Sequence, residues 1–271
     1  MSFQTTRRFF FHRAQAPFFL PPRASAILII MLRKVSVYLP VLVSLLFTAC
    51  QKELPVSIND YKTLGSSAHD LLSSAVYTAL RIEINYLPGY EPDNASLNNL
   101  RIFLQNYLNK PDGIVIATNL IAASGKTALS LSDIVAIEKK NRLEFTEGNT
   151  IAVHILIVDA DYTDSNDLGI SYWNTSFCLF GKAIYANSGN SAQVSRTNLL
   201  STLLEHEFGH LLGLVGQGSP EQSPHHDALN SLHCSNSNCL MYSLIETNPV
   251  SAVIPSFDAD CLADLRANGS K

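Results

Sequence analysis

Apolar positions along the chain repeat either at every second residue, as in a strand, or at helical spacing. Segments of the two kinds follow one another, which predicts strands alternating with helices. Residues 76–86 alternate apolar and polar side chains as a half-buried strand does. Residues 94–109 repeat their apolar positions at helical spacing, and a second strand is expected over 113–122. A second helix is expected over 132–142, where Ser132 can cap the first turn. This order predicts an α/β fold.

The next part of the chain contains one heavily apolar stretch and one long helix. Residues 151–159 read IAVHILIVD, which is typical of a strand in the middle of a sheet covered on both faces. Two short strands are expected near 168–173 and 177–185. A helix is then expected over 196–212, where Gly213 can end it.

The order of these elements indicates how the folded region is organised. We expect an α/β part over about 66–213, with a mixed, twisted sheet, and a small, loop-rich C-terminal subdomain over about 214–271. That subdomain contains one short helix near 258–267. The helix at 196–212 is expected to form the floor between the two parts. Residues 50–65 are expected to be a tether.

The first 49 residues are predicted to be a leader. From Met31, two basic residues precede an apolar run, and the small residues Thr48 and Ala49 stand before Cys50. This order is typical of a secretory signal peptide. Residues 1–30 precede a complete signal peptide, so we expect Met31 to be the true start.

Cys50 directly after Phe-Thr-Ala resembles the cysteine of the bacterial lipobox. The resemblance implies cleavage before Cys50, lipidation of Cys50 and attachment to a membrane through acyl chains. An ordinary signal peptide with an incidental cysteine is the alternative. Gln51 in the next position resembles the sorting signal for the outer membrane, so we expect a lipid-anchored protein of the bacterial cell envelope.

The composition excludes several other classes of protein. Hydrophobic residues make up 46% of the 271 residues and charged residues 15%, which favours a packed core over disorder. The net charge is −4 with no basic block in the body of the chain, so nucleic acid is a poor candidate partner. After the leader, no apolar run reaches the length that a membrane-spanning helix needs.

The predicted long helix contains the sequence His206-Glu207-Phe208-Gly209-His210. Residues four apart lie on one helical face, so His206 and His210 can bind a single ion. Zinc suits imidazole ligands and lowers the pKa of bound water, and Glu207 can accept a proton from that water. Glu207 also lies in an otherwise apolar stretch, where an idle charge would be costly. We therefore expect one catalytic Zn²⁺ ion with Glu207 as the general base.

A catalytic zinc ion normally has three protein ligands, so a third ligand is expected downstream. The candidates are His233 and the cluster His225, His226 and Asp227. HEFGHLLG resembles the first half of the metzincin motif, HExxHxxGxxH followed by a methionine turn. Gly216 stands where the third histidine of that motif would be, so its short form does not fit.

The segment from His233 to Met241 resembles the archaemetzincin continuation, H-C-x4-C-x-M. The resemblance implies that His233 is the third ligand after an insertion at about 215–232, and that Met241 forms a hydrophobic floor beneath the metal. It leaves Tyr242 as either an oxyanion contact or a packed aromatic side chain. The His225 cluster remains the alternative, either as a ligand source or as a polar rim of the cleft. The resemblance further implies a metzincin-like zincin fold and a peptide or protein substrate, with residues 169–173 as the edge strand that pairs with it.

Four cysteines remain once Cys50 is lipidated: Cys178, Cys234, Cys239 and Cys261. Archaemetzincins resemble this chain in the Cys-x4-Cys pair, but they use it with a later Cys-x2-Cys to bind a second, structural zinc ion. Here the second cysteine of that later pair is missing. In an oxidising envelope we expect disulfides that hold the tail together, with no pairing assigned.

These features together predict a zinc-dependent metallopeptidase. A non-catalytic, zinc-containing binding lipoprotein is the alternative, although such a scaffold has no need of a buried base such as Glu207. Zinc-dependent hydrolysis of a non-peptide amide is a third hypothesis. The sequence does not specify the substrate or the oligomeric state.

Overall fold

The computed structural model describes residues 59–164, 167–244 and 253–271, all of which belong to one compact unit, Leu54–Lys271. The predicted leader, Cys50 and most of the predicted tether lie outside the described residues. Within the described part, no helix combines the length and the apolar character needed to cross a membrane.

Strands and helices alternate along the chain as predicted, and the fold is mixed α/β. The strands are β1 (Ala79–Tyr86), β2 (Gly113–Leu120), β3 (Ala128–Leu129), β4 (Thr150–Val158), β5 (Asp161–Tyr162), β6 (Gly169–Trp173) and β7 (Ser176–Phe180). The helices are α2 (Ala68–Leu72), α3 (Asn94–Tyr107), α4 (Leu131–Asn141), α5 (Gly181–Ala186), α6 (Arg196–Leu211) and α7 (Ala259–Ala267).

The main sheet has five strands in the order β2-β1-β4-β7-β6. The pairs β1–β2, β1–β4 and β4–β7 are parallel, whereas β6 runs antiparallel to β7. β4 lies in the middle of the sheet, and every residue after Thr150 in it is buried, which confirms the expectation for this apolar stretch. β2 and β6 form the two edges, so β6 is available for pairing with another extended chain.

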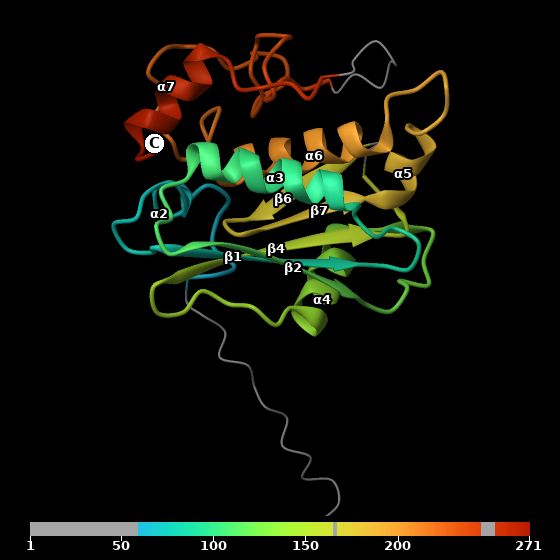
Figure 1. The fold of residues 1–271 in the computed structure, drawn as a ribbon. Coiled ribbons are helices and arrows are strands. Elements are labelled where there is room, and N and C mark those ends of the chain that lie inside the picture. The colour runs from blue at the N-terminus through green and yellow to red at the C-terminus, as the bar shows by residue number, and fades with distance from the viewer. Residues whose placement is uncertain (1–58, 165–166, 245–252) are drawn as a thin grey trace, which may run out of the picture. The chain divides into compact units, whose positions relative to one another are not determined.

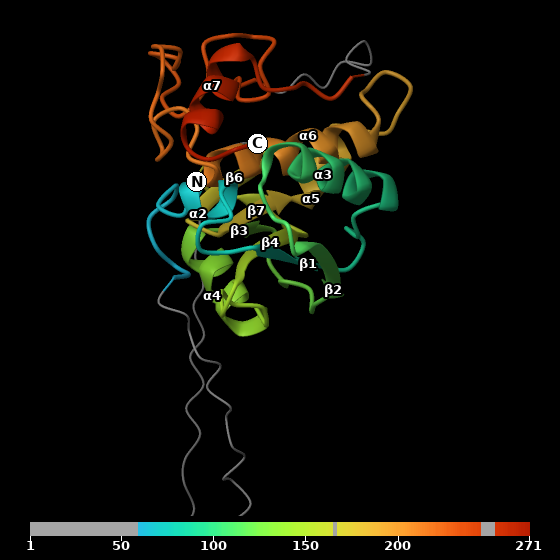
Figure 2. The same cartoon turned by 60° about the vertical axis from the view of Figure 1, so that its left-hand side comes forward.

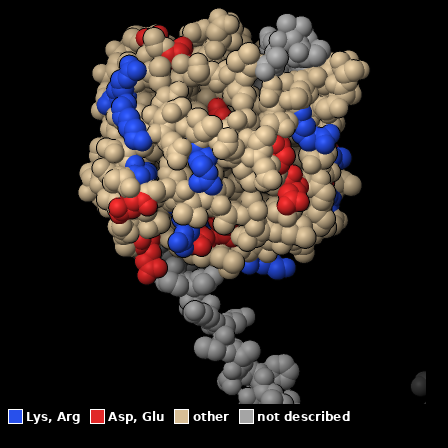
Figure 3. Space-filling view, viewed as in Figure 1, with Lys and Arg blue, Asp and Glu red and all other residues tan. Residues whose placement is uncertain are grey.

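The helices lie on both faces of this sheet (Figures 1 and 2). α3 and α6 cover one face and α4 covers the other, while the C-terminal tail with α7 lies beyond α6. Since the sheet packs on one side of α6 and the tail on the other, every residue from Leu199 to Leu211 is buried. The predicted helix thus separates the sheet from the tail. On the face shown in Figure 3, acidic and basic side chains are interspersed.

Two local predictions differ from the structure. α4 is capped by Ser130, not Ser132: the Ser130 side chain accepts a hydrogen bond from the Asp133 backbone, and the Asp133 side chain accepts one from Ser130. This reciprocal capping box satisfies two backbone donors at once. The strand predicted over 177–185 ends at Phe180, and the chain continues as α5 from Gly181.

The end of the predicted tether is part of the folded body. Asp60 is buried and lies 3.0 Å from the guanidinium of Arg142, which also pairs with Glu138 at 2.9 Å. The Asp60 carboxylate also accepts a hydrogen bond from the Thr146 backbone. The tether prediction therefore does not hold for residues 59–65, because a buried carboxylate that pairs with Arg142, Thr146 and Thr175 fixes this segment to the folded body.

Candidate metal centre

α6 carries the first two histidines of the candidate site. Ser195 caps the helix by accepting a hydrogen bond from the Asn198 backbone, and the helix ends near Gly213, whose φ of 77° is in the left-handed region. His206 and His210 lie one turn apart, and their ring centroids are 4.9 Å from each other. The helical spacing therefore brings the two imidazoles to one place, as predicted.

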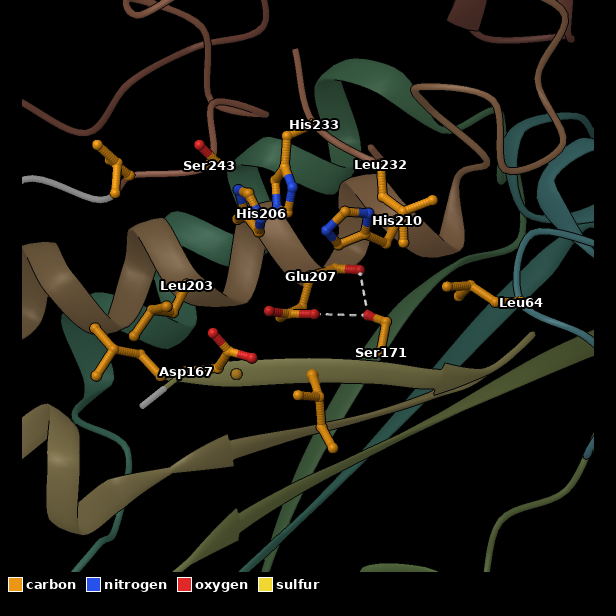
Figure 4. Close-up of a pocket in the computed structure, with 14 residues that line it drawn as sticks. Leu64, Asp167, Ser171, Leu203, His206, Glu207, His210, Leu232, His233 and Ser243 are labelled. Atoms are coloured by element: carbon orange, nitrogen blue, oxygen red, sulfur yellow. Dashed lines mark hydrogen bonds between the residues drawn. The ribbon is translucent and has the colours of Figure 1, made fainter. Parts of the chain in front are cut away.

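His233 joins these two from the C-terminal tail. Its ring centroid lies 5.4 Å from that of His206 and 5.3 Å from that of His210. The potential ligand atoms of the three residues all lie within 4.8 Å of one another. We call these three residues the histidine cluster; Figure 4 shows them around a common space above Glu207.

The His225 alternative does not reach this place. His225 is buried elsewhere in the tail, and its Nε2 lies 2.8 Å from the Asp264 carboxylate. His226 faces Glu221, with its Nδ1 3.1 Å from a carboxylate oxygen. The structure thus brings His233, and neither of these two histidines, to His206 and His210.

The environment of the histidine cluster suits metal ligation. The Nδ1 of His206 lies 2.7 Å from the backbone oxygen of Leu240, which can only accept, so Nδ1 carries the proton and Nε2 keeps a free lone pair. Burial lowers the pKa of His206 to about 4 and that of His210 well below its ordinary value. The Nδ1 atoms of His210 and His233 are buried without a hydrogen-bond partner among the described residues. Three neutral, convergent imidazoles fit zinc.

Glu207 lies beside the histidine cluster and is held by β6. Its carboxylate accepts a hydrogen bond of 2.7 Å from the Ser171 hydroxyl, which also lies 3.1 Å from the Glu207 backbone oxygen. Burial raises the pKa of Glu207 to about 8, while the Ser171 hydrogen bond acts in the opposite direction. A Cβ at Gly169 would approach the Glu207 Oε1 to 2.6 Å, so a side chain at this strand position would displace the Glu207 carboxylate.

The sequence analysis did not identify Gly169 and Ser171 as supports of the base. Both lie on β6 two residues apart, and residues at that spacing point to the same face of a strand. That alternation is the signal that could have found them, once β6 is known to face α6.

Both α6 and β6 border a cleft of about 430 Å³. Its polar groups include the histidine cluster and Glu207, and several leucines contribute apolar walls. The lining residues are Leu64, Asp167, Leu168, Gly169, Ile170, Ser171, Leu203, His206, Glu207, His210, Leu232, His233, Ser243 and Leu244. The cleft therefore opens between the histidine cluster and the edge strand of the sheet.

Met241 lies against the backbone of α6 between the two helical histidines. It is fully buried, and a Cβ at Gly209 would overlap its sulfur atom. Its role as a hydrophobic floor beneath a metal stays a prediction. Tyr242 follows it, but it is not among the residues that line the cleft.

A second group of potential ligands lies further along the tail. His225, Cys234, Asp258 and Cys261 bring their ligand atoms within 4.8 Å of one another, and the sulfur of Cys239 lies 3.6 Å from that of Cys261. We call these five residues the thiol-rich cluster. Cys178 lies apart from them, in the middle of β7.

The expected disulfides are absent among the described cysteines, which are all free thiols. A separation of 3.6 Å between Cys239 and Cys261 is far longer than a disulfide bond of about 2.05 Å. It is close to the ~3.8 Å expected between two thiolates that bind one tetrahedral zinc ion at about 2.3 Å.

His225 has the environment of a metal ligand in the thiol-rich cluster. Its Nε2 pairs with Asp264, while its Nδ1 lies 3.6 Å from the sulfur of Cys234 and 3.8 Å from that of Cys261. A carboxylate on one ring nitrogen orients the other nitrogen towards a metal. Asp264 stands where a second cysteine of a Cys-x2-Cys pair would be, which explains why cysteine spacing alone did not reveal this cluster.

Comparisons with known proteins give matches only among solved structures. No protein-family model matches the sequence, and no curated protein matches it. The structure is similar to the archaemetzincin of Methanopyrus kandleri, with a TM-score of 0.46 and 14% identity over 70% of this chain and 96% of that chain. It is also similar to metalloproteinase-II from Bacteroides fragilis, with a TM-score of 0.40 and 15% identity over 72% of this chain and 54% of that chain.

Proposed function

We propose that this protein is a zinc-dependent metallopeptidase. One observation carries the proposal: three neutral imidazoles converge in a cleft that also holds the buried carboxylate of Glu207 and runs beside an edge strand. Three imidazoles and a neighbouring carboxylate are the groups that metal-assisted hydrolysis requires.

The proposed chemistry divides between the histidine cluster and Glu207. His206, His210 and His233 would hold zinc, which when bound polarises a carbonyl group and acidifies water. Glu207 accepts a proton from the attacking water as the water oxygen bonds to the carbonyl carbon. It then donates that proton to the leaving nitrogen as the C–N bond breaks. Ser171 keeps the carboxylate in place through both transfers.

The edge strand supports a peptide as the substrate. β6 is an edge strand that pairs only with β7 in the described sheet, and residues of β6 and α6 line the cleft. An extended peptide can pair with such an edge through its backbone, which gives affinity without strict sequence choice. The apolar walls at Leu168, Leu203 and Leu232 offer contacts for side chains of the peptide.

The alternative is a zinc-containing envelope protein that binds a partner without cleaving it. Such a protein would retain the histidine cluster for stability. It would gain nothing from Glu207, because a buried carboxylate costs free energy unless it is used.

Metal content and peptide cleavage, measured for the purified protein and its Glu207→Gln variant, test this proposal. We expect zinc in both proteins and cleavage of a broad peptide library by the parent alone, with a loss of ~10²–10⁴-fold in the variant. Zinc in both without cleavage by either would favour the binding protein. Equal cleavage by both would contradict the role of Glu207, and absence of metal from both would contradict the central claim.

We also propose that the thiol-rich cluster holds a second, structural metal ion in addition to the one catalytic zinc ion. Support comes from its free, buried thiols and from the pairing of His225 with Asp264. Closed sites with cysteine and histidine ligands are typical of structural zinc. A metal content near two per chain is expected, and a value near one would contradict this part of the proposal.

A lipid anchor on Cys50, with sorting to the outer membrane, remains a proposal that rests on the signal-peptide pattern. Expression of the full chain in a bacterium with labelled fatty acid should give a labelled protein in the outer-membrane fraction. The Cys50→Ser variant should carry no label. A labelled Cys50→Ser protein, or an unlabelled parent, would contradict the anchor.

A further inference from the structure

A buried carboxylate that the proposed chemistry does not use lies one residue before His206. Glu205 is 6% exposed, and it has no hydrogen bond or ion pair with any of the described residues. Successive residues of an α-helix project ~100° apart, so Glu205 faces away from Glu207 and from the cleft. A charged group in such a place is costly unless it has a partner.

Glu205 lines a pocket of about 250 Å³ between α3 and the tail. In Figure 3, the hollow between α3 and the C-terminal tail has an acidic side chain at its floor. Most of its walls are apolar or aromatic side chains, and asparagine and serine side chains add amide and hydroxyl groups. The lining residues are Asn99, Ile102, Phe103, Asn106, Tyr107, Glu205, Ile254, Pro255 and Ser256. We call this the Glu205 pocket.

The aromatic walls of the Glu205 pocket are held by mutual packing. The ring of Phe103 lies 5.1 Å from that of Tyr107, and both pack against Phe257, at 5.4 and 5.2 Å. The Phe257 ring also lies close to Gly209 on α6, since a Cβ at Gly209 would be 3.3 Å from it. The walls are therefore anchored to the same helix as Glu205. A pocket with rigid aromatic walls is preformed for a ligand.

We propose that the Glu205 pocket binds a primary alkylammonium group, in particular the lysine side chain of a peptide or protein. The ammonium would pair with the Glu205 carboxylate, and the aliphatic stem would lie along the apolar walls. Phe103 and Tyr107 line the same pocket, and aromatic rings attract a cation that lies over their faces. The lysine ammonium is a compact point charge on a flexible four-carbon stem, which suits a carboxylate that lines an otherwise apolar pocket. This inference does not depend on the proposed peptidase activity.

Binding of Nα-acetyl-lysine N-methylamide, measured by NMR titration of the whole protein, tests the proposal. The matched ligand is Nα-acetyl-norleucine N-methylamide, which has no ammonium group, and the matched variant is Glu207→Gln, on the same buried helix. We expect the lysine compound to bind the parent and the Glu207→Gln variant alike. Glu205→Gln should weaken binding by ~10-fold or more, because it removes one buried charge pair. The norleucine compound should not bind measurably.

Several outcomes would overturn the proposal. Unchanged binding to Glu205→Gln places the ammonium elsewhere, and loss of binding in Glu207→Gln alone places it in the cleft. Should Glu205→Gln fail to fold, Asn106→Trp provides a second route, because this exposed rim position lets the indole fill the mouth of the pocket. Retained binding in that variant would then count against the pocket.

A comparison of ligands identifies the source of the ammonium group. Cadaverine carries the same group on a free diamine, whereas the acetylated lysine amide represents a residue within a peptide. Tighter binding of the lysine compound than of cadaverine supports a peptide or protein partner. Tighter binding of cadaverine would contradict that partner and indicate a small amine as the ligand.

Discussion

The histidine cluster and the thiol-rich cluster take neighbouring residues of the tail, yet they differ in exposure and in chemistry. His233 belongs to the first and Cys234, the following residue, to the second. The histidine cluster borders the cleft, whereas His225, Cys234 and Cys261 are all buried away from it. An open site with three ligands suits catalysis, and a closed site suits stability. We infer that the thiol-rich cluster holds the chain segment that brings His233 to His206 and His210.

The largest expected effect is the loss of peptide cleavage when the histidine cluster is changed and the thiol-rich cluster is left intact. His210→Ala should reduce peptide cleavage by ~10³-fold or more, because a bound metal contributes several kcal/mol to transition-state stabilisation. The thermal midpoint should change little, since the thiol-rich cluster stays intact. Cleavage kinetics and a melting curve of the same preparation check both points. A large fall in the midpoint would mean that the two clusters do not have separate roles.

The second effect is a loss of thermal stability when the thiol-rich cluster is changed. His225→Ala should lower the thermal midpoint by ~5 °C or more, since in a domain of this size 1 kcal/mol corresponds to roughly 2–4 °C. The reason is that binding of a structural metal contributes to the free energy of folding. His226→Ala is the matched control, because the His226 side chain is exposed and its ring faces Glu221. Equal midpoints for the two variants would count against a metal in the thiol-rich cluster.

A smaller effect concerns the support of His225. Asp264→Asn removes the charge that faces the His225 Nε2, and loss of such a partner typically costs 10–100-fold in metal affinity. Asp260→Asn, on the same helix, is the control because Asp260 is exposed and accepts a hydrogen bond from the Ser223 hydroxyl. Competition with a chromophoric zinc chelator measures both variants. If the two variants lose metal equally, Asp264 has no specific role.

The smallest effect concerns the support of Glu207. Ser171→Ala should lower kcat by ~10-fold, the expected loss for one hydrogen bond to a charged group, while metal content stays unchanged. Ser171→Thr keeps the hydroxyl and should recover part of the activity. A change in KM alone would instead make Ser171 a contact of the substrate.

Local periodicity predicted a large part of the fold. The apolar run of β4 predicted a central strand, and the helical spacing of α6 predicted that His206 and His210 face one place. Both predictions depend on interactions within a few residues. One error occurred where a distant contact decides the outcome, since Asp60 is fixed by Arg142. The α4 cap at Ser130 and the start of α5 at Gly181 are local features that apolar periodicity does not resolve.

The sequence by itself determined the helix, the spacing of His206, Glu207 and His210 on it, and the α/β class, because these follow from backbone geometry and the burial of apolar side chains. Only the tertiary structure decided that His233 approaches α6 while His225 pairs with Asp264, since the path of the tail from residue 214 has no regular period. It likewise decided that the cysteines remain free thiols, that Ser171 supports Glu207, and that Glu205 faces a separate pocket. Each of these depends on which segments meet across the fold, and that is set by the packing of the whole chain.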